Sequence, residues 1–373
     1  MIPNGSEDAS ELKDMLFPKK YKVTRRPFGS ADGGNMSKNS YIRGHLTNNQ
    51  YTMRFKNHIF ALALAAALLP AATGCMVGKF MCNYALLPEE HGNDIEGDRA
   101  KTESRYPGII KWYDEKHEAG IFRDTSIIGE GGYKLHAVYS AAQDPASAQG
   151  TAIVIHGYTD NHICFLNLVR MYRDSLNYNV FVPDLHYHGY SEGRAVQMGW
   201  LDRLDIERWI PLAHSLWPND FMVIHGVSMG GATTMMVSGD RTPDYVKAFI
   251  DDCGYSSVWD QYKHNLKQQF HLPPFPVLNS ASIVCKRRYG WGFKEASSVD
   301  QLAKSEKPVL FIHGDSDDFV PTAHVYKNFE AKTKGYKEMW LAPGSAHAMA
   351  YKDHPAEYTE HVRSFLAKVK SME

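Results

Sequence analysis

The sequence predicts an α/β protein with a mostly parallel sheet that carries helices on both faces. From residue 151 onward, short apolar runs alternate with segments of amphipathic helical spacing. Parallel strands are buried on both faces and therefore have continuous apolar runs, while the connecting helices cover the sheet. Polar residues follow several of these runs, at the carboxyl edge of the sheet, where such proteins bind their ligands.

The expected elements follow one another in a regular order. Within Phe122–Ser140, two strand-like runs flank Gly129–Gly132 and predict a hairpin. Parallel strands are expected at 151–155, 179–184, 221–225, 246–251, 308–313 and 337–342. Helices are expected at 161–174, 201–217, 322–332 and from Pro355 onward, where apolar residues recur with a 3.6-residue period.

The stretch around Ser228 has the pattern of a nucleophile elbow. Apolar residues at 221–225 predict a strand, Gly226-Val227-Ser228-Met229-Gly230 matches G-x-S-x-G, and Ala232–Val237 predicts a helix. In such an elbow the serine occupies a strained strand-to-helix turn, and the glycines leave room for the backbone. The start of the helix can stabilise developing negative charge. Ser228 is therefore the candidate nucleophile.

A serine needs a base, and the base needs an acid that orients it. The strand at 308–313 leads into three acids, Asp315, Asp317 and Asp318, and the spacing from His313 to Pro321 favours Asp317. His347 is the only histidine directly after the last strand. The order Ser228, Asp317, His347 is the order expected for this fold.

The oxyanion of a tetrahedral intermediate needs two backbone donors. One is expected from Met229, the residue after the nucleophile, and the other from Tyr158, in the loop that follows the strand at 151–155.

Together these motifs resemble the α/β-hydrolase-fold serine hydrolases, closest to bacterial esterase/lipase-like and serine aminopeptidase-like members with an N-terminal membrane segment. The matching pieces are His156-Gly157, Asp184–Gly193, Gly226–Gly230, His313–Pro321 and Gly344–His347. His186 stands where the family usually has arginine, in a loop expected to support the elbow. The resemblance covers about 120–370 and implies an α/β-hydrolase domain over 121–373.

The resemblance also implies a helical lid over the serine, at about 255–300. Two helix-like runs lie there, Trp259–Gln269 and Val277–Tyr289. Aromatic and basic residues are expected either to line the approach to the serine or to pack the lid onto the domain, namely Phe270, Phe275, Lys286, Arg287, Arg288, Trp291 and Phe293.

Composition narrows the classes of partner and cofactor that the protein is expected to bind. The formal net charge of −1 over 373 residues offers no electrostatic footprint for nucleic acid. The five cysteines are scattered, with no visible disulfide framework or C-x-x-C site. His186-x-His188 with Asp184, or His156 and His162, is a weak metal pattern, so neither a metal nor a cofactor is expected.

The N-terminal quarter predicts a membrane segment. Residues 1–52 are polar, and are expected to be a disordered tail or sequence ahead of a true start at Met53. Within 53–78, a basic stretch precedes an apolar run from Ile59 through Val77, long enough for a signal anchor that leaves the catalytic domain extracytoplasmic, in a bacterial cell envelope. A cleaved signal peptide is the alternative, with a lipoprotein site at Cys75. A buried helix is the third reading, against which the polar flanks argue. Residues 79–120 are expected to wrap the catalytic domain as short helices.

These residues predict hydrolysis of a small-molecule carboxylic ester through an acyl-enzyme on Ser228. Peptide hydrolysis of the serine aminopeptidase type uses the same machinery, so the triad does not separate the two. A third hypothesis is a membrane-tethered binding protein with the same fold and no turnover, against which the complete set of catalytic residues argues.

Overall fold

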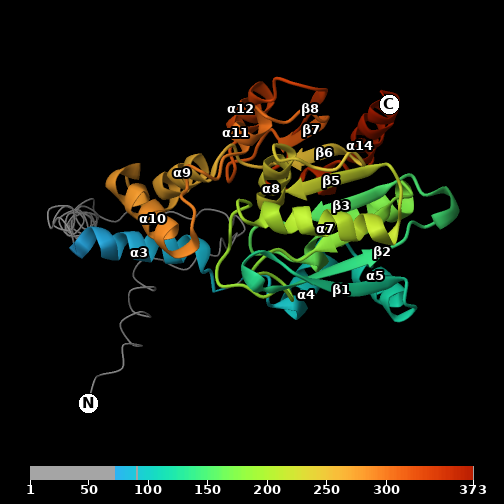
Figure 1. Cartoon of the computed structure of the whole chain (residues 1–373), viewed down its shortest axis with the longest axis horizontal. Coiled ribbons are helices and arrows are strands. Elements are labelled where there is room, and N and C mark those ends of the chain that lie inside the picture. The colour runs from blue at the N-terminus through green and yellow to red at the C-terminus, as the bar shows by residue number, and fades with distance from the viewer. Residues whose placement is uncertain (1–71, 90, 373) are drawn as a thin grey trace, which may run out of the picture. The chain divides into compact units, whose positions relative to one another are not determined.

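The computed structural model describes residues 72–89 and 91–372. Eight strands form one sheet in the order β1-β2-β4-β3-β5-β6-β7-β8 (Figure 1). The first pairings, β1 with β2 and β2 with β4, are antiparallel, and all the others are parallel. The predicted α/β-hydrolase fold, with its mostly parallel sheet, is confirmed.

The strands lie close to the apolar runs that predicted them. Their bounds are β1 Phe122–Ile128, β2 Lys134–Ser140, β3 Thr151–Ile155, β4 Asn179–Pro183, β5 Met222–Val227, β6 Val246–Asp252, β7 Val309–Gly314 and β8 Lys337–Ala342. Strands β3, β4, β5 and β7 are buried along their whole length. Burial on both faces explains why their sequences are continuously apolar rather than alternating.

Helices cover both faces of the sheet, and two separate apolar cores result. The main covering helices are α7 Asp202–Leu216, α8 Met229–Ser238, α12 Ala323–Ala331 and α14 Pro355–Lys370, with the short helices α11 Ser298–Leu302 and α13 Ala350–Asp353. In α14 the buried residues Tyr358, Val362 and Phe365 recur at the predicted helical spacing.

Two helix predictions need correction. Helix α8 begins at Met229 rather than Ala232, because the first turn follows directly on Ser228. The helix expected at 161–174 is divided into a 3₁₀ turn at His162–Phe165, helix α6 at Leu166–Arg170 and a π-helical turn at Met171–Ser175. The π turn arises because the N–H of Leu176 donates to the carbonyl of Met171, five residues earlier.

Three helices precede the sheet in the described part of the chain, α3 Ala72–Leu86, α4 Ile95–Arg105 and α5 Ile109–Glu118. None of the helices in 72–89 and 91–372 is both long enough and apolar enough to span a bilayer. The predicted membrane segment falls mostly outside these ranges, and so does the side chain of Cys75. Its membrane role therefore stays a prediction, as does the division of the chain into domains.

Two further helices lie between β6 and β7, α9 Val258–Phe270 and α10 Pro274–Tyr289. In Figure 1 they project from the carboxyl end of the sheet, and α10 lies beside α3. Trp291 and Phe293 are fully buried, and the Trp291 indole donates to the Gln197 side chain at 2.9 Å. These two aromatic residues pack the insertion onto the domain, whereas Phe275 is 75% exposed.

Candidate active site

Ser228 occupies the sharp turn between β5 and α8. Its backbone has φ +57° and ψ −115°, a conformation that is strained for a residue with a side chain. The Ser228 N–H donates to the carbonyl of Asp252 at 2.7 Å, and its carbonyl accepts from Ala232. The turn is therefore held by the neighbouring strand β6 and by the first turn of the helix.

Two glycines make this turn possible. A Cβ at Gly226 would lie 2.0 Å from the Gly230 carbonyl oxygen, and a Cβ at Gly230 would lie 2.2 Å from the Ile155 carbonyl oxygen. Real Cβ atoms do not approach backbone this closely, so both positions of the G-x-S-x-G pattern require glycine for steric reasons.

The structure brings Ser228, His347 and Asp317 into one hydrogen-bonded line. His347 Nε2 lies 2.8 Å from Ser228 Oγ, and His347 Nδ1 lies 2.7 Å from Asp317 Oδ2. Asp317 follows β7 and His347 follows β8, so both reach the carboxyl edge of the sheet from adjacent strands. Of the three candidate acids, Asp315 and Asp318 are exposed, and Asp315 caps the turn at Gly344.

Asp317 is built to remain ionised. Its Oδ1 accepts from the N–H groups of Phe319 and Val320 at 3.0 and 2.9 Å. Burial alone would raise its pKa, but hydrogen bonds from His313 and His347 lower the pKa to about 2. An ionised acid at this position orients the His347 ring and can stabilise its protonated form.

The two expected oxyanion donors lie beside Ser228. Met229 N–H is at the start of α8, and no acceptor in the described part of the chain faces it or the N–H of Tyr158. A Cβ built on Gly157 would lie 3.6 Å from the Ser228 Cβ, so the loop that carries Tyr158 passes directly against the nucleophile.

Histidines fasten this loop to the segment after β4. His156 Nδ1–H donates to the carbonyl of Gly157, and its Nε2 accepts from the N–H of Leu185 at 2.9 Å. Burial lowers the pKa of His156 to about 4, which keeps the ring neutral and able to accept. His188 Nε2 accepts from the N–H of Thr159 at 3.3 Å. These contacts hold the backbone on both sides of Tyr158.

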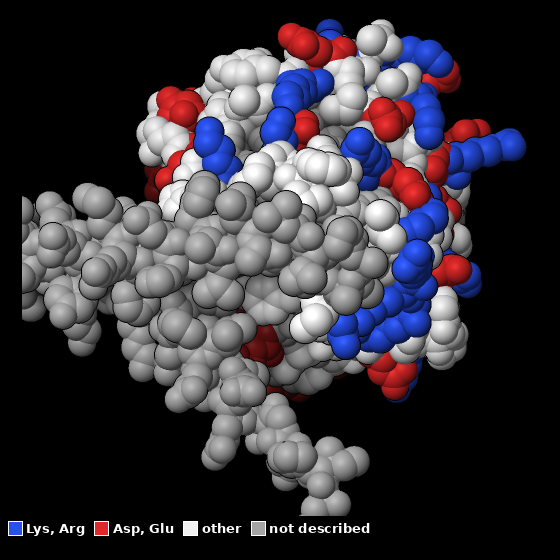
Figure 2. Space-filling view, turned by 90° about the vertical axis from the view of Figure 1, so that its left-hand side faces the viewer, with Lys and Arg blue, Asp and Glu red and all other residues white. Residues whose placement is uncertain are grey.

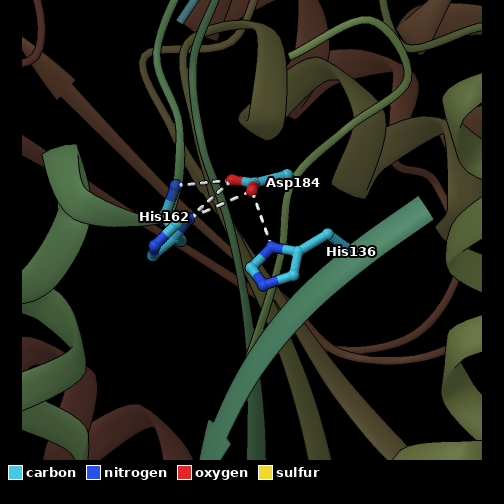
Figure 3. A group of neighbouring side chains, drawn as sticks. All are labelled: His136, His162 and Asp184. Atoms are coloured by element: carbon cyan, nitrogen blue, oxygen red, sulfur yellow. Dashed lines mark hydrogen bonds and ion pairs between the residues drawn. The ribbon is translucent and has the colours of Figure 1, made fainter. Parts of the chain in front are cut away.

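Asp184, on that same segment, lies between two more histidines (Figure 3). His136 Nδ1 lies 2.8 Å from its Oδ2, and His162 Nδ1 lies 2.9 Å from its Oδ1. The backbone N–H groups of His162 and Tyr190 also donate to this carboxylate. Burial opposes its ionisation, but the two histidines hold the pKa of Asp184 well below its usual range.

Two groups of side chains bring three potential metal ligands together in the described residues. The first is His136, His162 and Asp184, and the second is Cys253, Asp317 and His347. In the first, four N–H donors fill the carboxylate of Asp184, and the separations are those of hydrogen bonds. Hydrogen bonding therefore explains the geometry of the first group, and in the second group it joins Asp317 to His347 within the candidate triad.

Sequence reasoning missed three residues that surround the triad. His313, used above only as a spacing marker, lies 3.3 Å from Asp317 Oδ2 and donates to the carbonyl of Val320. Phe319 packs against the His347 ring, with centroids 4.9 Å apart. Cys253 is buried behind the same group. Nothing in their spacing marks them, because their positions depend on how three strand ends converge.

Comparisons with known proteins agree with this geometry. The model of the prolyl oligopeptidase family matches residues 210–372, which include Ser228, Asp317 and His347. The uncharacterized protein YqkD of Bacillus subtilis (strain 168) is 30% identical over 236 residues, which are 63% of this chain and 76% of YqkD. This chain belongs to the same α/β-hydrolase family as YqkD.

Solved structures share the fold of this α/β-hydrolase at low sequence identity. The Pyrococcus furiosus esterase Pf2001 has a TM-score of 0.54 and 19% identity, over 68% of this chain and 95% of Pf2001. A Mycobacterium tuberculosis puromycin-hydrolyzing peptidase has a TM-score of 0.50 and 20% identity, over 66% of this chain and 39% of the peptidase.

Proposed function

We propose that this α/β-hydrolase cleaves a carboxylic ester through an acyl-enzyme on Ser228. The observation that carries the proposal is the pair of contacts at His347, 2.8 Å to the Ser228 hydroxyl and 2.7 Å to the Asp317 carboxylate. A serine hydroxyl is a weak nucleophile unless a base takes its proton, and this line supplies the base and the acid that orients it.

The reaction follows from the geometry. His347 Nε2 takes the hydroxyl proton as Ser228 Oγ attacks the ester carbonyl, and Asp317 stabilises the resulting imidazolium. The N–H groups of Tyr158 and Met229 bind the oxyanion, a contribution of about 3–4 kcal/mol for each donor. His347 then protonates the leaving alcohol, and water activated by the same ring hydrolyses the acyl-enzyme.

Peptide hydrolysis is the second candidate. The match to the prolyl oligopeptidase family favours it, and so does the fold shared with a puromycin-hydrolyzing peptidase. Comparing kcat/KM for p-nitrophenyl esters of short and long acyl chains with kcat/KM for aminoacyl p-nitroanilides tests the choice. A preference for the anilides would replace the ester proposal.

A fluorophosphonate probe separates an enzyme from a binding protein with the same fold. We expect the probe to label Ser228, because it requires an activated serine, and we expect Ser228→Ala to abolish both labelling and turnover while the fold survives. Ser256→Ala is the matched control, since Ser256 Oγ also lies 2.9 Å from a histidine, His324, outside the candidate triad. Full esterase activity in Ser228→Ala would refute the assignment.

We also propose that the domain is tethered to a membrane, with the catalytic part extracytoplasmic. The apolar run from Ile59 supports this, and so do Met76, Phe80 and Tyr84, which are 72%, 42% and 39% exposed along α3. Carbonate extraction of membranes from the native host is the test. Complete release of the full-length protein into the soluble fraction would contradict the tether.

A further inference from the structure

Helices α3 and α10, far apart in the chain, pack side by side (Figure 1). Residues later in α3 contact residues later in α10. Gly78 lies against Ser280, and Arg288 Nη1 donates to Asn83 Oδ1 at 2.7 Å. The two helices therefore run in the same direction. Figure 2 shows the molecule from this side, with Lys and Arg side chains interspersed with Asp and Glu along its right-hand margin.

Small residues let the two helices approach closely. A Cβ at Gly78 would lie 2.7 Å from the backbone carbonyl carbon of Ser280, so only glycine fits at this point of α3. Ala281, in the next position of α10, is buried in the same core. Close approach of two helix backbones brings short side chains on facing positions into contact.

Cys82 and Cys285 occupy such facing positions, one turn beyond Gly78 and Ala281 respectively. Both side chains are completely buried in the same apolar core. Each of the two cysteines also shifts the pKa of the other, which requires their side chains to be neighbours. Two buried cysteines on facing positions of two closely packed helices have the arrangement that a disulfide requires, with side chains that face each other.

We propose that Cys82 and Cys285 form a disulfide that fastens α3 to α10. One of the two cysteines, as its thiolate, attacks one sulfur of a low-molecular-weight disulfide, such as oxidised glutathione, and releases the first thiol. The other cysteine, as its thiolate, then attacks the protein sulfur of this mixed disulfide and releases the second thiol. The two cysteines lose two electrons and two protons, and the oxidant is reduced to two thiols.

The surroundings of the two sulfurs differ when α3 is docked. The neighbouring Cys285 thiol lowers the pKa of Cys82 against the effect of burial, and the charge of Arg288 lowers it further. The pKa of Cys285 is raised by the same contact and by burial. In the docked pair Cys82 is therefore the more acidic thiol. Because both side chains are then fully buried, the exchange with the oxidant takes place while α3 is still undocked.

The bond would join three parts of the molecule. α10 belongs to the insertion between β6 and β7, and α3 begins within the end of the predicted membrane segment. The Tyr158 hydroxyl donates to the carbonyl of Ala85 in α3 at 3.1 Å, one turn beyond Cys82. A covalent tie between α3 and α10 therefore restrains the insertion relative to the loop beside Ser228.

Peptide mapping tests the bond directly. The purified full-length protein is partly unfolded in urea, incubated with oxidised glutathione, returned to buffer, alkylated in denaturant and digested without reduction. We expect a peptide pair joined through Cys82 and Cys285 as the main disulfide species. Full alkylation of both cysteines after this treatment, or linkage of either one mainly to another cysteine, would overturn the proposal.

Thermal unfolding provides a second readout. A disulfide that closes so long a segment should raise the Tm of the oxidised protein over the reduced protein by roughly 5–10 °C. This difference should vanish in Cys82→Ser and in Cys285→Ser, and persist in Cys164→Ser, which changes a cysteine outside the pair. An equal difference in all three variants would contradict the assignment. A linked protein without esterase activity would support the disulfide while refuting the proposed ester hydrolysis.

Discussion

Two aspartates in this molecule each lie between two histidines. Asp317 lies between His313 and His347, and Asp184 lies between His136 and His162. Both carboxylates follow a parallel strand, both are fully buried at the side chain, and both have a lowered pKa. From residue types and burial alone the two groups would be hard to distinguish.

The difference lies in what the second ring nitrogen reaches. His347 presents Nε2 to the hydroxyl of Ser228, and its side chain keeps 19% of its surface exposed. His136 presents Nε2 to a second carboxylate, Asp124, at 2.8 Å. A histidine held between an acid and a hydroxyl can move a proton to a reacting group, whereas one whose two ring nitrogens both face acids has no reacting group within reach. The same three-residue arrangement thus serves two purposes.

The largest expected effect comes from Asp317→Asn. The amide can still accept from the N–H groups of Phe319 and Val320, but it no longer orients and stabilises a protonated His347. We expect kcat to fall by about 10⁴-fold, while the lost carboxylate charge lowers Tm without unfolding the protein at assay temperature. Steady-state kinetics with circular dichroism melting measures both. A loss of less than tenfold would remove Asp317 from the proposed mechanism.

Asp184→Asn should have the opposite profile. It removes the charge that pairs with two buried or half-buried histidines, and breaking such a buried group costs about 3–5 kcal/mol of unfolding free energy. Turnover per folded molecule should fall by less than about tenfold, since Asp184 touches neither Ser228 nor His347. Urea denaturation and titration of active sites with the fluorophosphonate probe separate the two quantities. Unchanged stability would mean that the group does not support the loop.

The contribution of His136 to the free energy of unfolding should depend on pH. Burial would lower its pKa, but Asp184 and Asp124 raise it above the ordinary value. The folded state therefore binds this proton more tightly than the unfolded chain, and the stabilisation is complete below pH 6.5 and lost as pH rises through the raised pKa. Urea unfolding between pH 6 and 9 should show a steeper decline for wild type than for His136→Gln. Parallel curves would contradict this.

The contribution of Asp317 to the free energy of unfolding should change with pH in the opposite direction, and in the acid range. Its pKa of about 2 lies below the ordinary value of 3.8, so its contribution is present above pH 3.8 and disappears as pH falls toward 2. Asp317→Asn should flatten the acid limb of the unfolding curve between these values. An equally steep limb in the variant would assign the acid sensitivity to other groups.

The smallest change in unfolding free energy is expected at a polar atom that belongs to neither of the two aspartate groups. The Tyr262 hydroxyl in α9 is buried without a hydrogen-bond partner among the described residues. Tyr262→Phe should leave the unfolding free energy unchanged or raise it by up to about 1 kcal/mol. Tyr358→Phe is the matched control, because the Tyr358 hydroxyl contacts Asp252 and His225, and it should destabilise by about 1–2 kcal/mol. Similar losses in both variants would refute this distinction.

Much of the fold could be predicted because the signals are local. Burial on both faces forces continuous apolar runs, so strands such as Thr151–Ile155 and Lys337–Ala342 have the bounds expected for them. The helix expected at 161–174 was wrong in its continuity, since the Asn161 side chain caps a 3₁₀ turn and a π turn follows. Caps and irregular turns depend on single hydrogen bonds that periodicity does not register.

The sequence by itself determined the order of strands and helices, the two glycines of the elbow and the chain order Ser228, Asp317, His347, because these depend on local sterics and on strand polarity. Only the tertiary structure decided that Asp317 faces His347 while Asp184 faces His136 and His162. It also decided that Cys82 and Cys285 are buried in one apolar core. Such meetings depend on how distant segments converge in space, and sequence spacing carries no record of that convergence.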